Sequence, residues 1–151
     1  MTWQENPLPR LLVRHEGIRL RPYTDTVGKL TIGIGRNLDD KGITEDEALY
    51  LLRNDVEEAR RGLDKAIPWW LWLDEVRQAV LLDMAFNMGV RGLLGFIVTL
   101  PLIQEGRYAE AADAMLKSKW ARQVKGRAAE LAVMMRTGQW PAWVSTPAGG
   151  A

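Results

Sequence analysis

The sequence predicts an α+β fold that is mainly helical and carries one small hairpin. Apolar residues recur at helical spacing over residues 44–67, and Pro68 ends this pattern because proline cannot continue a helix. Two short segments, residues 19–23 and 29–34, flank a turn-forming segment, which is typical of a β-hairpin. Of the 151 residues, 47% are apolar, so one domain or two small lobes can bury a proper core.

The first predicted element is a short helix that ends at Glu16. Pro7 and Pro9 favour its first turn, and Gly17 is a natural stop because glycine takes the left-handed position after a helix without strain. The apolar residues of this helix share one face with the single histidine of the chain: Leu8, Leu11, Leu12 and His15. The sequence therefore places a carboxyl group at the end of this helix.

The hairpin that follows should present a flat face. Residues 24–28, Thr-Asp-Thr-Val-Gly, form the predicted turn, and side chains of the returning strand should alternate between its two faces. Thr31, Gly33 and Gly35 then share one face with little side-chain bulk, on which a sugar ring can lie close to the backbone. A glycine pair in a strand more often reflects close packing, and no third glycine follows to complete a dinucleotide fingerprint.

Two carboxyl groups flank this flat face, Glu16 at the helix end and Asp25 in the turn. A separated pair of carboxyls beside a groove is the apparatus that cleaves glycosidic bonds, with one acting as acid and the other as base or nucleophile. The alternative is that both are ordinary solvated charges, as most of the 19 acidic residues must be. These residues alone leave a glycosidase as one of several possibilities.

The rest of the chain reads as a series of helices. Residues 44–47 form a capping box that opens the long helix, and Asp74 caps the next helix, which ends at residues 87–89. Shorter helices are predicted at residues 97–104, 108–117 and 126–135, and residues 146–151 should form a flexible tail. The tryptophans at positions 69, 70 and 72 either pack a junction, which we favour, or contact sugars or a membrane interface.

Composition excludes several classes of site. There is no cysteine and one histidine, so the sequence predicts neither a metal centre nor a cofactor. Net charge is +1, but residues 39–64 hold nine acidic and four basic residues, whereas residues 117–136 hold six basic and one acidic. This asymmetry fits either a solvated surface or a basic lobe that attracts an anionic cell wall or membrane, and it does not require nucleic acid. We expect no signal peptide and no transmembrane helix.

The spacing of the first motif resembles a known family. Glu16, eight residues, Asp25, five residues and then Thr31-Ile-Gly-Ile-Gly resembles the catalytic segment of phage lysozymes of the T-even type, which are endolysins that hydrolyse peptidoglycan. Further parallels occur in order along the chain at residues 54–56, 86–89, 118–120, 127–128 and 136–140. The resemblance implies a single lysozyme-like catalytic domain over residues 1–145, with a small β lobe at about 17–43, a linking helix at 44–67 and a helical lobe made of 1–16 and 68–145. The glycan would bind in a groove between the lobes.

The resemblance also implies roles for individual residues. Glu16 would be the general acid, Asp25 the base for the attacking water, and Thr31 the residue that orients this water. This arrangement implies an inverting mechanism, with the carboxyls roughly 6.5–9.5 Å apart. Four residues would bind substrate or shape the groove: Gly35, Phe86, Asn87 and Arg127. In the family, an arginine that matches Arg127 reaches toward the glutamate. Asn87 is alternatively a helix-end cap, and Arg127 a surface cation.

One position departs from the family pattern. Arg36 stands where a histidine usually follows the glycine pair, and in the family that histidine can pair with an aspartate that matches Asp55. We therefore expect Arg36 to pair with Asp55 and to help position the lobe, with a charge that does not change near neutral pH.

The function implied is a muramidase that cleaves the β-1,4 bond between N-acetylmuramic acid and N-acetylglucosamine and so lyses the host cell. A lytic transglycosylase cuts the same bond without water, and a non-catalytic wall- or membrane-binding lysis protein is the alternative from another class. By family analogy, the protein would be a monomer that stays in the host cytoplasm until a membrane-permeabilising holin releases it to the periplasm. The start at Met1 favours a free endolysin over a tail-associated lysozyme.

Overall fold

The structure is a computed structural model that describes residue 2 and residues 5–145. The predicted flexible tail, residues 146–151, lies outside the described residues. The chain divides into two compact units, Met1–Leu51 and Leu52–Ala151, called here the first and the second unit. The expectation that residues 1–16 belong to the helical lobe stays a prediction.

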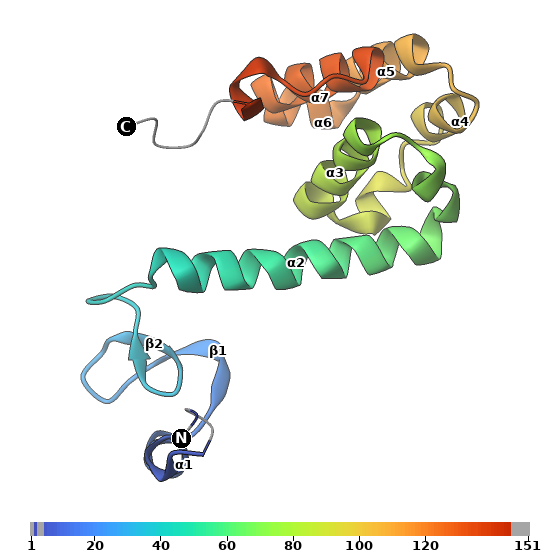
Figure 1. Ribbon diagram of the computed structural model, residues 1–151. Helices are drawn as coiled ribbons and strands as arrows, with labels where there is room; N and C mark the ends of the chain where they lie inside the picture. The colour runs from blue at the N-terminus through green and yellow to red at the C-terminus, as the bar shows by residue number, and fades with distance from the viewer. Residues whose placement is uncertain (1, 3–4, 146–151) are drawn as a thin grey trace. The chain divides into compact units, whose positions relative to one another are not determined.

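The first unit contains a helix, a small antiparallel sheet and the start of a long helix (Figure 1). The strands lie in the order β1-β2-β3, so the predicted hairpin is confirmed and gains a third strand. A strand of two residues is too short to show alternation, which is why the sequence did not predict β3. The elements are α1 (Pro7–Glu16), β1 (Arg19–Thr24), β2 (Leu30–Gly33), β3 (Arg36–Asn37) and the first turns of α2 (Glu45–Ala66).

The returning strand is shorter than predicted. β2 ends at Gly33, and the alternation expected to continue to Gly35 is wrong because both glycines adopt φ +71°, a left-handed value that an extended strand does not allow. The chain turns there and comes back as β3, in which Arg36 pairs with Ile32. Gly35 therefore lies in a turn at the end of the sheet rather than on a strand face.

The long helix α2 begins with the predicted capping box. The Thr44 hydroxyl accepts from the backbone N–H of Glu47 at 3.2 Å, and the Glu47 carboxylate accepts from the backbone N–H of Thr44 at 2.8 Å. These bonds satisfy two N–H groups that have no partner within the helix. The helix ends at Ala66, two residues before Pro68, as the sequence predicts.

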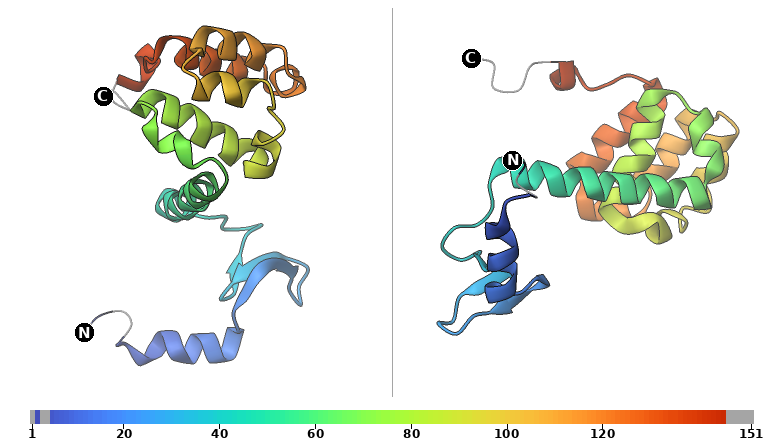
Figure 2. Two further views of the ribbon diagram at one scale, coloured as in Figure 1. Left: turned by 90° about the vertical axis from the view of Figure 1, so that its right-hand side faces the viewer. Right: turned by 60° about the horizontal axis from the view of Figure 1, so that its bottom comes forward.

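The second unit is helical throughout its described part. Asp74 caps α3 as predicted, since its carboxylate accepts from the backbone N–H of Arg77 at 3.1 Å. Gly89, at φ +79°, interrupts α3 where the sequence predicts its end. Helix α7 packs against α3, α5 and α6 (Figure 2). The elements after α2 are η1 (Pro68–Trp72), α3 (Glu75–Leu93), α4 (Thr99–Gln104), α5 (Tyr108–Leu116), α6 (Lys119–Val124), α7 (Gly126–Thr137) and η2 (Ala142–Ser145).

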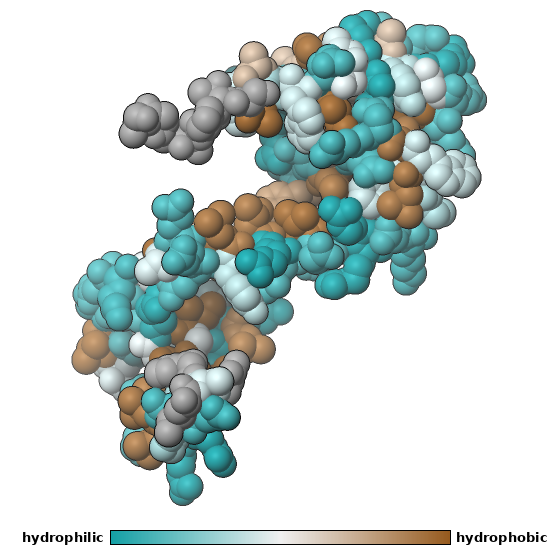
Figure 3. All heavy atoms as spheres, in the orientation of Figure 1, coloured by the Kyte–Doolittle hydropathy of each residue, from teal (hydrophilic) through white to brown (hydrophobic). Residues whose placement is uncertain are grey.

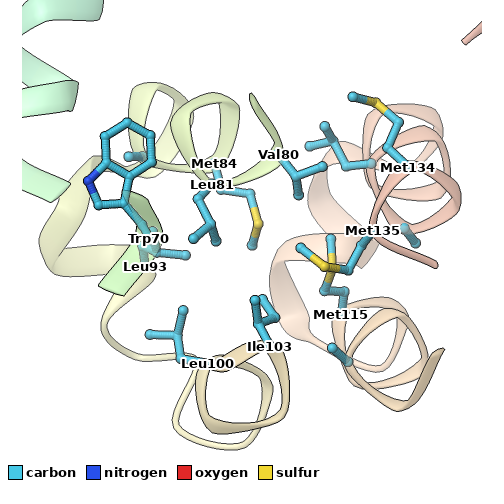
Figure 4. Close-up of a cluster of buried hydrophobic side chains, with 14 of the residues drawn as sticks. Trp70, Val80, Leu81, Met84, Leu93, Leu100, Ile103, Met115, Met134 and Met135 are labelled. Carbon is cyan, nitrogen blue, oxygen red and sulfur yellow. The ribbon is translucent and has the colours of Figure 1, made fainter. Parts of the chain in front are cut away.

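Apolar side chains from the end of α2, from η1 and from α3 to α7 form the core of the second unit, part of which Figure 4 shows. The three methionines that the sequence predicts as core fillers are all buried: Met115, Met134 and Met135. The tryptophan cluster divides. Trp70 is fully buried and its indole N–H donates to the Asp64 carboxylate at 2.8 Å, whereas Trp72 is 86% exposed. The prediction that this cluster packs in the interior is therefore confirmed for Trp70 and wrong for Trp72.

These features confirm a mainly helical α+β fold. Apolar side chains also reach the surface, among them the exposed Leu49, Leu51 and Leu52 of α2, a helix along which Figure 3 shows hydrophobic residues. Within the described part of the chain, no helix is both long enough and apolar enough to cross a membrane.

Candidate active site

Glu16 occupies the last position of α1, where the sequence predicts it. The helix starts at a capping side chain, Asn6, which accepts from the backbone N–H of Leu8 at 2.9 Å. It stops because Gly17 turns away at φ +75°, while the Gly17 N–H closes the last turn on the carbonyl of Val13 at 2.8 Å. The chain therefore fixes where the exposed Glu16 side chain leaves the backbone.

The carboxyl of Glu16 lies against the backbone of Gly35. A Cβ atom at Gly35 would stand 3.0 Å from Oε2 of Glu16 and 3.2 Å from its Cδ. Contacts this short are tighter than ordinary van der Waals contact, so a side chain at this position would push the carboxyl away by a few tenths of an ångström. Gly35 thus shapes the position of Glu16, which gives this glycine a direct role beside a candidate catalytic group.

Asp25 is fixed by the turn that it begins. Its Oδ1 accepts from the backbone N–H of Val27 at 2.9 Å and from that of Lys29 at 2.8 Å. Such side-chain to backbone bonds are the reason aspartate favours turns. Within the described residues, Oδ2 accepts no hydrogen bond, and it is therefore the oxygen that a water or a substrate group can approach.

Thr31 is buried, with 3% of its surface exposed, and its hydroxyl donates to the carbonyl of Lys29 at 3.0 Å. It lies on β2 between Tyr23 of β1 and Asn37 of β3. The hydroxyl proton is thus committed to the backbone, while the oxygen lone pairs can still accept a hydrogen bond from water. The predicted role of Thr31 in orienting water stays a prediction.

In the second unit, Phe86 and Arg127 line one pocket of about 350 Å³. Arg127 does not stand as an isolated cation, because its Nε donates to the Asp83 carboxylate at 2.8 Å. Phe86 is 45% exposed and forms part of the apolar wall. The pocket is lined by Leu52, Val56, Ala59, Ala79, Leu82, Asp83, Phe86 and Arg127.

The sequence did not identify Asp83. Asp83 precedes Asn87 by one helical turn on α3, and this spacing places both residues on the same face as Phe86. The spacing could have identified Asp83 from the sequence. Its partner Arg127 lies 44 residues further along the chain, beyond any local pattern. The expected approach of Arg127 to Glu16 stays a prediction.

Asn87 makes a specific contact with another predicted motif residue. Its side-chain oxygen accepts from the indole N–H of Trp120 at 2.8 Å, which ties α3 to α6. Trp120 in turn packs edge-on against Phe96, with ring centroids 5.9 Å apart. The amide NH₂ group of Asn87 keeps two donors, so substrate binding by the exposed Asn87 stays a prediction.

Arg36 pairs with a different residue from the one expected. Its guanidinium donates to both carboxylate oxygens of Glu47, at 2.7 and 2.6 Å, and to the carbonyl of Gly42 at 3.2 Å. The predicted partner, Asp55, lies eight residues further along α2, about 12 Å along the helix axis. The short loop between β3 and α2 therefore brings Arg36 to the first turn of the helix.

No group of three or more histidine or acidic side chains in the described residues is arranged to hold a metal ion. The first unit places the Glu16 carboxyl beside the backbone of Gly35, in the turn between β2 and β3. A helix that ends in a carboxyl and leads into a small sheet, in a chain that is otherwise helical, defines the class: a lysozyme-like fold.

Comparison with known proteins identifies the family. The phage lysozyme family model matches residues 13–139, and the chain belongs to this family. It is 31% identical to a probable T4-type lysozyme of Dictyostelium discoideum, over 85% of this chain and 92% of that protein. It is also 31% identical to an endolysin of Bacillus phage B103, over 71% of this chain and 42% of the relative.

A further relative is a phage spike protein rather than a lysozyme or endolysin by name. The pre-baseplate central spike protein of Enterobacteria phage T4 is 31% identical over 95% of this chain. The chain spans only 31% of the length of that spike protein. The family match covers residues 13–139 of this chain, whereas the share of each of these relatives that the chain spans ranges from 31% to 92%.

Proposed function

We propose that this protein is a muramidase that hydrolyses the β-1,4 bond between N-acetylmuramic acid and N-acetylglucosamine in bacterial peptidoglycan. The observation that carries the proposal is the placement of Glu16, whose carboxyl rests on the bare backbone of Gly35 at the end of α1. Membership of the phage lysozyme family supports the same substrate class.

In the proposed mechanism, Glu16 gives its proton to the glycosidic oxygen while the bond from that oxygen to the sugar C1 breaks. A water attacks C1 from the opposite face and passes a proton to Asp25, whose Oδ1 is held by two backbone N–H groups. Thr31 would accept a hydrogen bond from this water. Attack from the opposite face gives inversion of configuration.

Arg127, Asn87 and Phe86 would contribute to substrate binding from the second unit. Arg127 and Phe86 support this role because they line the same pocket, one with a cation and the other with an aromatic face. A carboxylate of peptidoglycan is a suitable partner for the cation, and a sugar ring for the aromatic face.

The test is mass spectrometry of the muropeptides that purified sacculi release, with the wild type and Glu16→Gln compared side by side. We expect reducing muramic ends from the wild type and no release by the variant. Anhydro ends would instead indicate a lytic transglycosylase and remove the role of Asp25 as a base. Release by neither protein would contradict an enzymatic function and favour a non-catalytic wall-binding protein.

The biological use follows from the same activity. The relatives that are named endolysins support a role in lysis of the host cell. By analogy with the family, we propose that a membrane-permeabilising holin releases the protein and that it acts as a monomer in the periplasm. The similarity to the T4 spike protein favours a second use, as the lytic part of a phage particle. Detection of the protein in purified virions by mass spectrometry distinguishes the second use from the first.

A further inference from the structure

A bidentate ion pair stands one residue away from the glycine that supports the candidate acid. Gly35 contacts the Glu16 carboxyl, and the next residue, Arg36, binds both oxygens of Glu47. The guanidinium also donates to the carbonyl of Gly42 at 3.2 Å, so three hydrogen bonds hold it. All of these residues belong to the first unit.

Glu47 is itself held by the start of the helix. Its Oε2 accepts from the Thr44 backbone N–H at 2.8 Å as part of the capping box, and the same oxygen accepts from Arg36 at 2.7 Å. A carboxylate that satisfies a helix N-terminus and a planar guanidinium at once has little freedom to turn. These contacts also hold the pKa of Glu47 at about 2, with the Arg36 side chain as the largest cause, so the pair stays charged at ordinary pH.

The backbone on the other side of Arg36 is fixed as well. Arg36 pairs with Ile32 across the sheet, while Gly35 before it has a left-handed backbone and makes no ladder pair. Gly35 therefore lies directly before a residue that is held by the sheet and by the ion pair, and its position depends on where Arg36 is held. The Glu16 carboxyl occupies the space that a Cβ atom at Gly35 would need, so the position of Gly35 sets how far the carboxyl can extend over this backbone.

We infer that Arg36 and Glu47 are positioning residues for the general acid, acting through Gly35 on the Glu16 carboxyl. This inference rests on the proposed function. Glu47 would thus help to position the acid although it lies 31 residues from Glu16 in the chain. The role differs from the family pattern, in which the residue at position 36 pairs with the aspartate that matches Asp55. The ion pair would align the acid with the leaving oxygen in the transition state more than it would bind the substrate.

Steady-state kinetics on soluble peptidoglycan fragments test this inference, with wild type, Glu47→Gln, Arg36→Gln and Arg36→Lys. Glutamine at position 47 keeps the shape and one acceptor for the helix cap but loses the charge. We expect kcat to fall about tenfold in both glutamine variants with KM nearly unchanged, because small displacements of a catalytic group weaken transition-state interactions first. Arg36→Lys keeps the positive charge but cannot bind both carboxylate oxygens as the planar guanidinium does, so its kcat should lie between those of the wild type and Arg36→Gln.

A matched control is available in the second unit. Arg107 forms an exposed bidentate ion pair with Glu110, and Arg107→Gln breaks an interaction of the same chemistry away from Gly35 in the chain. We expect this variant to keep the kcat of the wild type. A general loss of stability would affect both pairs, whereas a positioning role affects only the Arg36–Glu47 pair.

The outcomes separate the two levels of the proposal. If the wild type releases no muropeptides, the proposed function fails. If the wild type is active and Glu16→Gln is silent, but both glutamine variants keep the kcat of the wild type, the positioning role alone is wrong. Should a glutamine variant fail to fold, Arg36→Lys decides the question: a reduced kcat supports the inference, and an unchanged kcat overturns it.

Discussion

Different interactions stabilise each of the two units internally. Among the described residues of the first unit, Thr31 alone is buried. The turns and helix caps of this unit are fixed by hydrogen bonds such as those of Asp25 and Glu47. The second unit buries a continuous apolar core that includes Trp70, Leu81 and Met135. The difference implies that substitutions in the first unit should act mainly on geometry and activity, and substitutions in the core of the second mainly on stability.

The largest expected effect on stability is at Trp70. Trp70→Ala removes a fully buried indole and its hydrogen bond to Asp64, and we expect a loss of about 3–5 kcal/mol in the free energy of unfolding. Urea unfolding followed by circular dichroism measures it. Trp72→Ala is the matched control, since Trp72 is 86% exposed and should change stability by no more than about 0.5 kcal/mol. Equal losses in the two variants would contradict the division of this cluster.

The next effect concerns activity in the first unit. Gly35→Ala places a Cβ 3.0 Å from Oε2 of Glu16, so the carboxyl must move by a few tenths of an ångström and kcat should fall about tenfold. The left-handed backbone adds a strain of about 1–2 kcal/mol, which lowers stability separately. Activity assays and thermal unfolding measure the two effects.

Gly106→Ala separates strain from contact. Gly106 has a similar backbone, at φ +77°, but nothing lies within 4 Å of an added Cβ, and it lies in the second unit. It should therefore lose stability like Gly35→Ala and keep much more of its activity. If both variants lose activity equally, the contact between Gly35 and Glu16 has no special role.

The features that the sequence predicted correctly depend on short-range signals. Gly17 after Glu16, Asp74 before α3 and the capping box of α2 each act within three or four residues, so the pattern contains both partners. The hairpin was also found, because its turn residues are contiguous. These local signals were enough to place Glu16 at a helix end and Asp25 in a turn.

The features that were missed depend on the tertiary fold. The family pattern led to the expectation that Arg36 pairs with Asp55, which was wrong because the loop before α2 brings Arg36 to Glu47 in the first turn of the helix. Asp83 meets Arg127 across 44 residues. The strand β3 was missed because two residues are too short to show alternation.

A smaller effect is expected at Asp83 in the second unit, where an ion pair touches a pocket rather than the core. Asp83→Ala leaves Arg127 without its carboxylate partner, so the guanidinium is no longer held in one orientation for substrate binding. We therefore expect KM to rise about threefold with little change in kcat. Stability should change by less than about 1 kcal/mol, as the pair is partly exposed. A fall in kcat without a change in KM would contradict a binding role for Arg127.

The smallest effect is a pH dependence of stability that comes from Glu47. Its pKa is about 2 in the folded protein, mainly because of the Arg36 side chain and then the Thr44 backbone N–H, against an ordinary value of 4.5. A lowered pKa stabilises the folded state above pH 4.5, where the carboxylate is charged in both states, and this contribution is lost as the pH falls toward 2. The difference in unfolding free energy between wild type and Glu47→Gln should therefore shrink over this range, as measured by urea unfolding at several pH values. Arg36→Gln should remove most of the same dependence, and a dependence unchanged in Arg36→Gln would show that the ion pair is not its source.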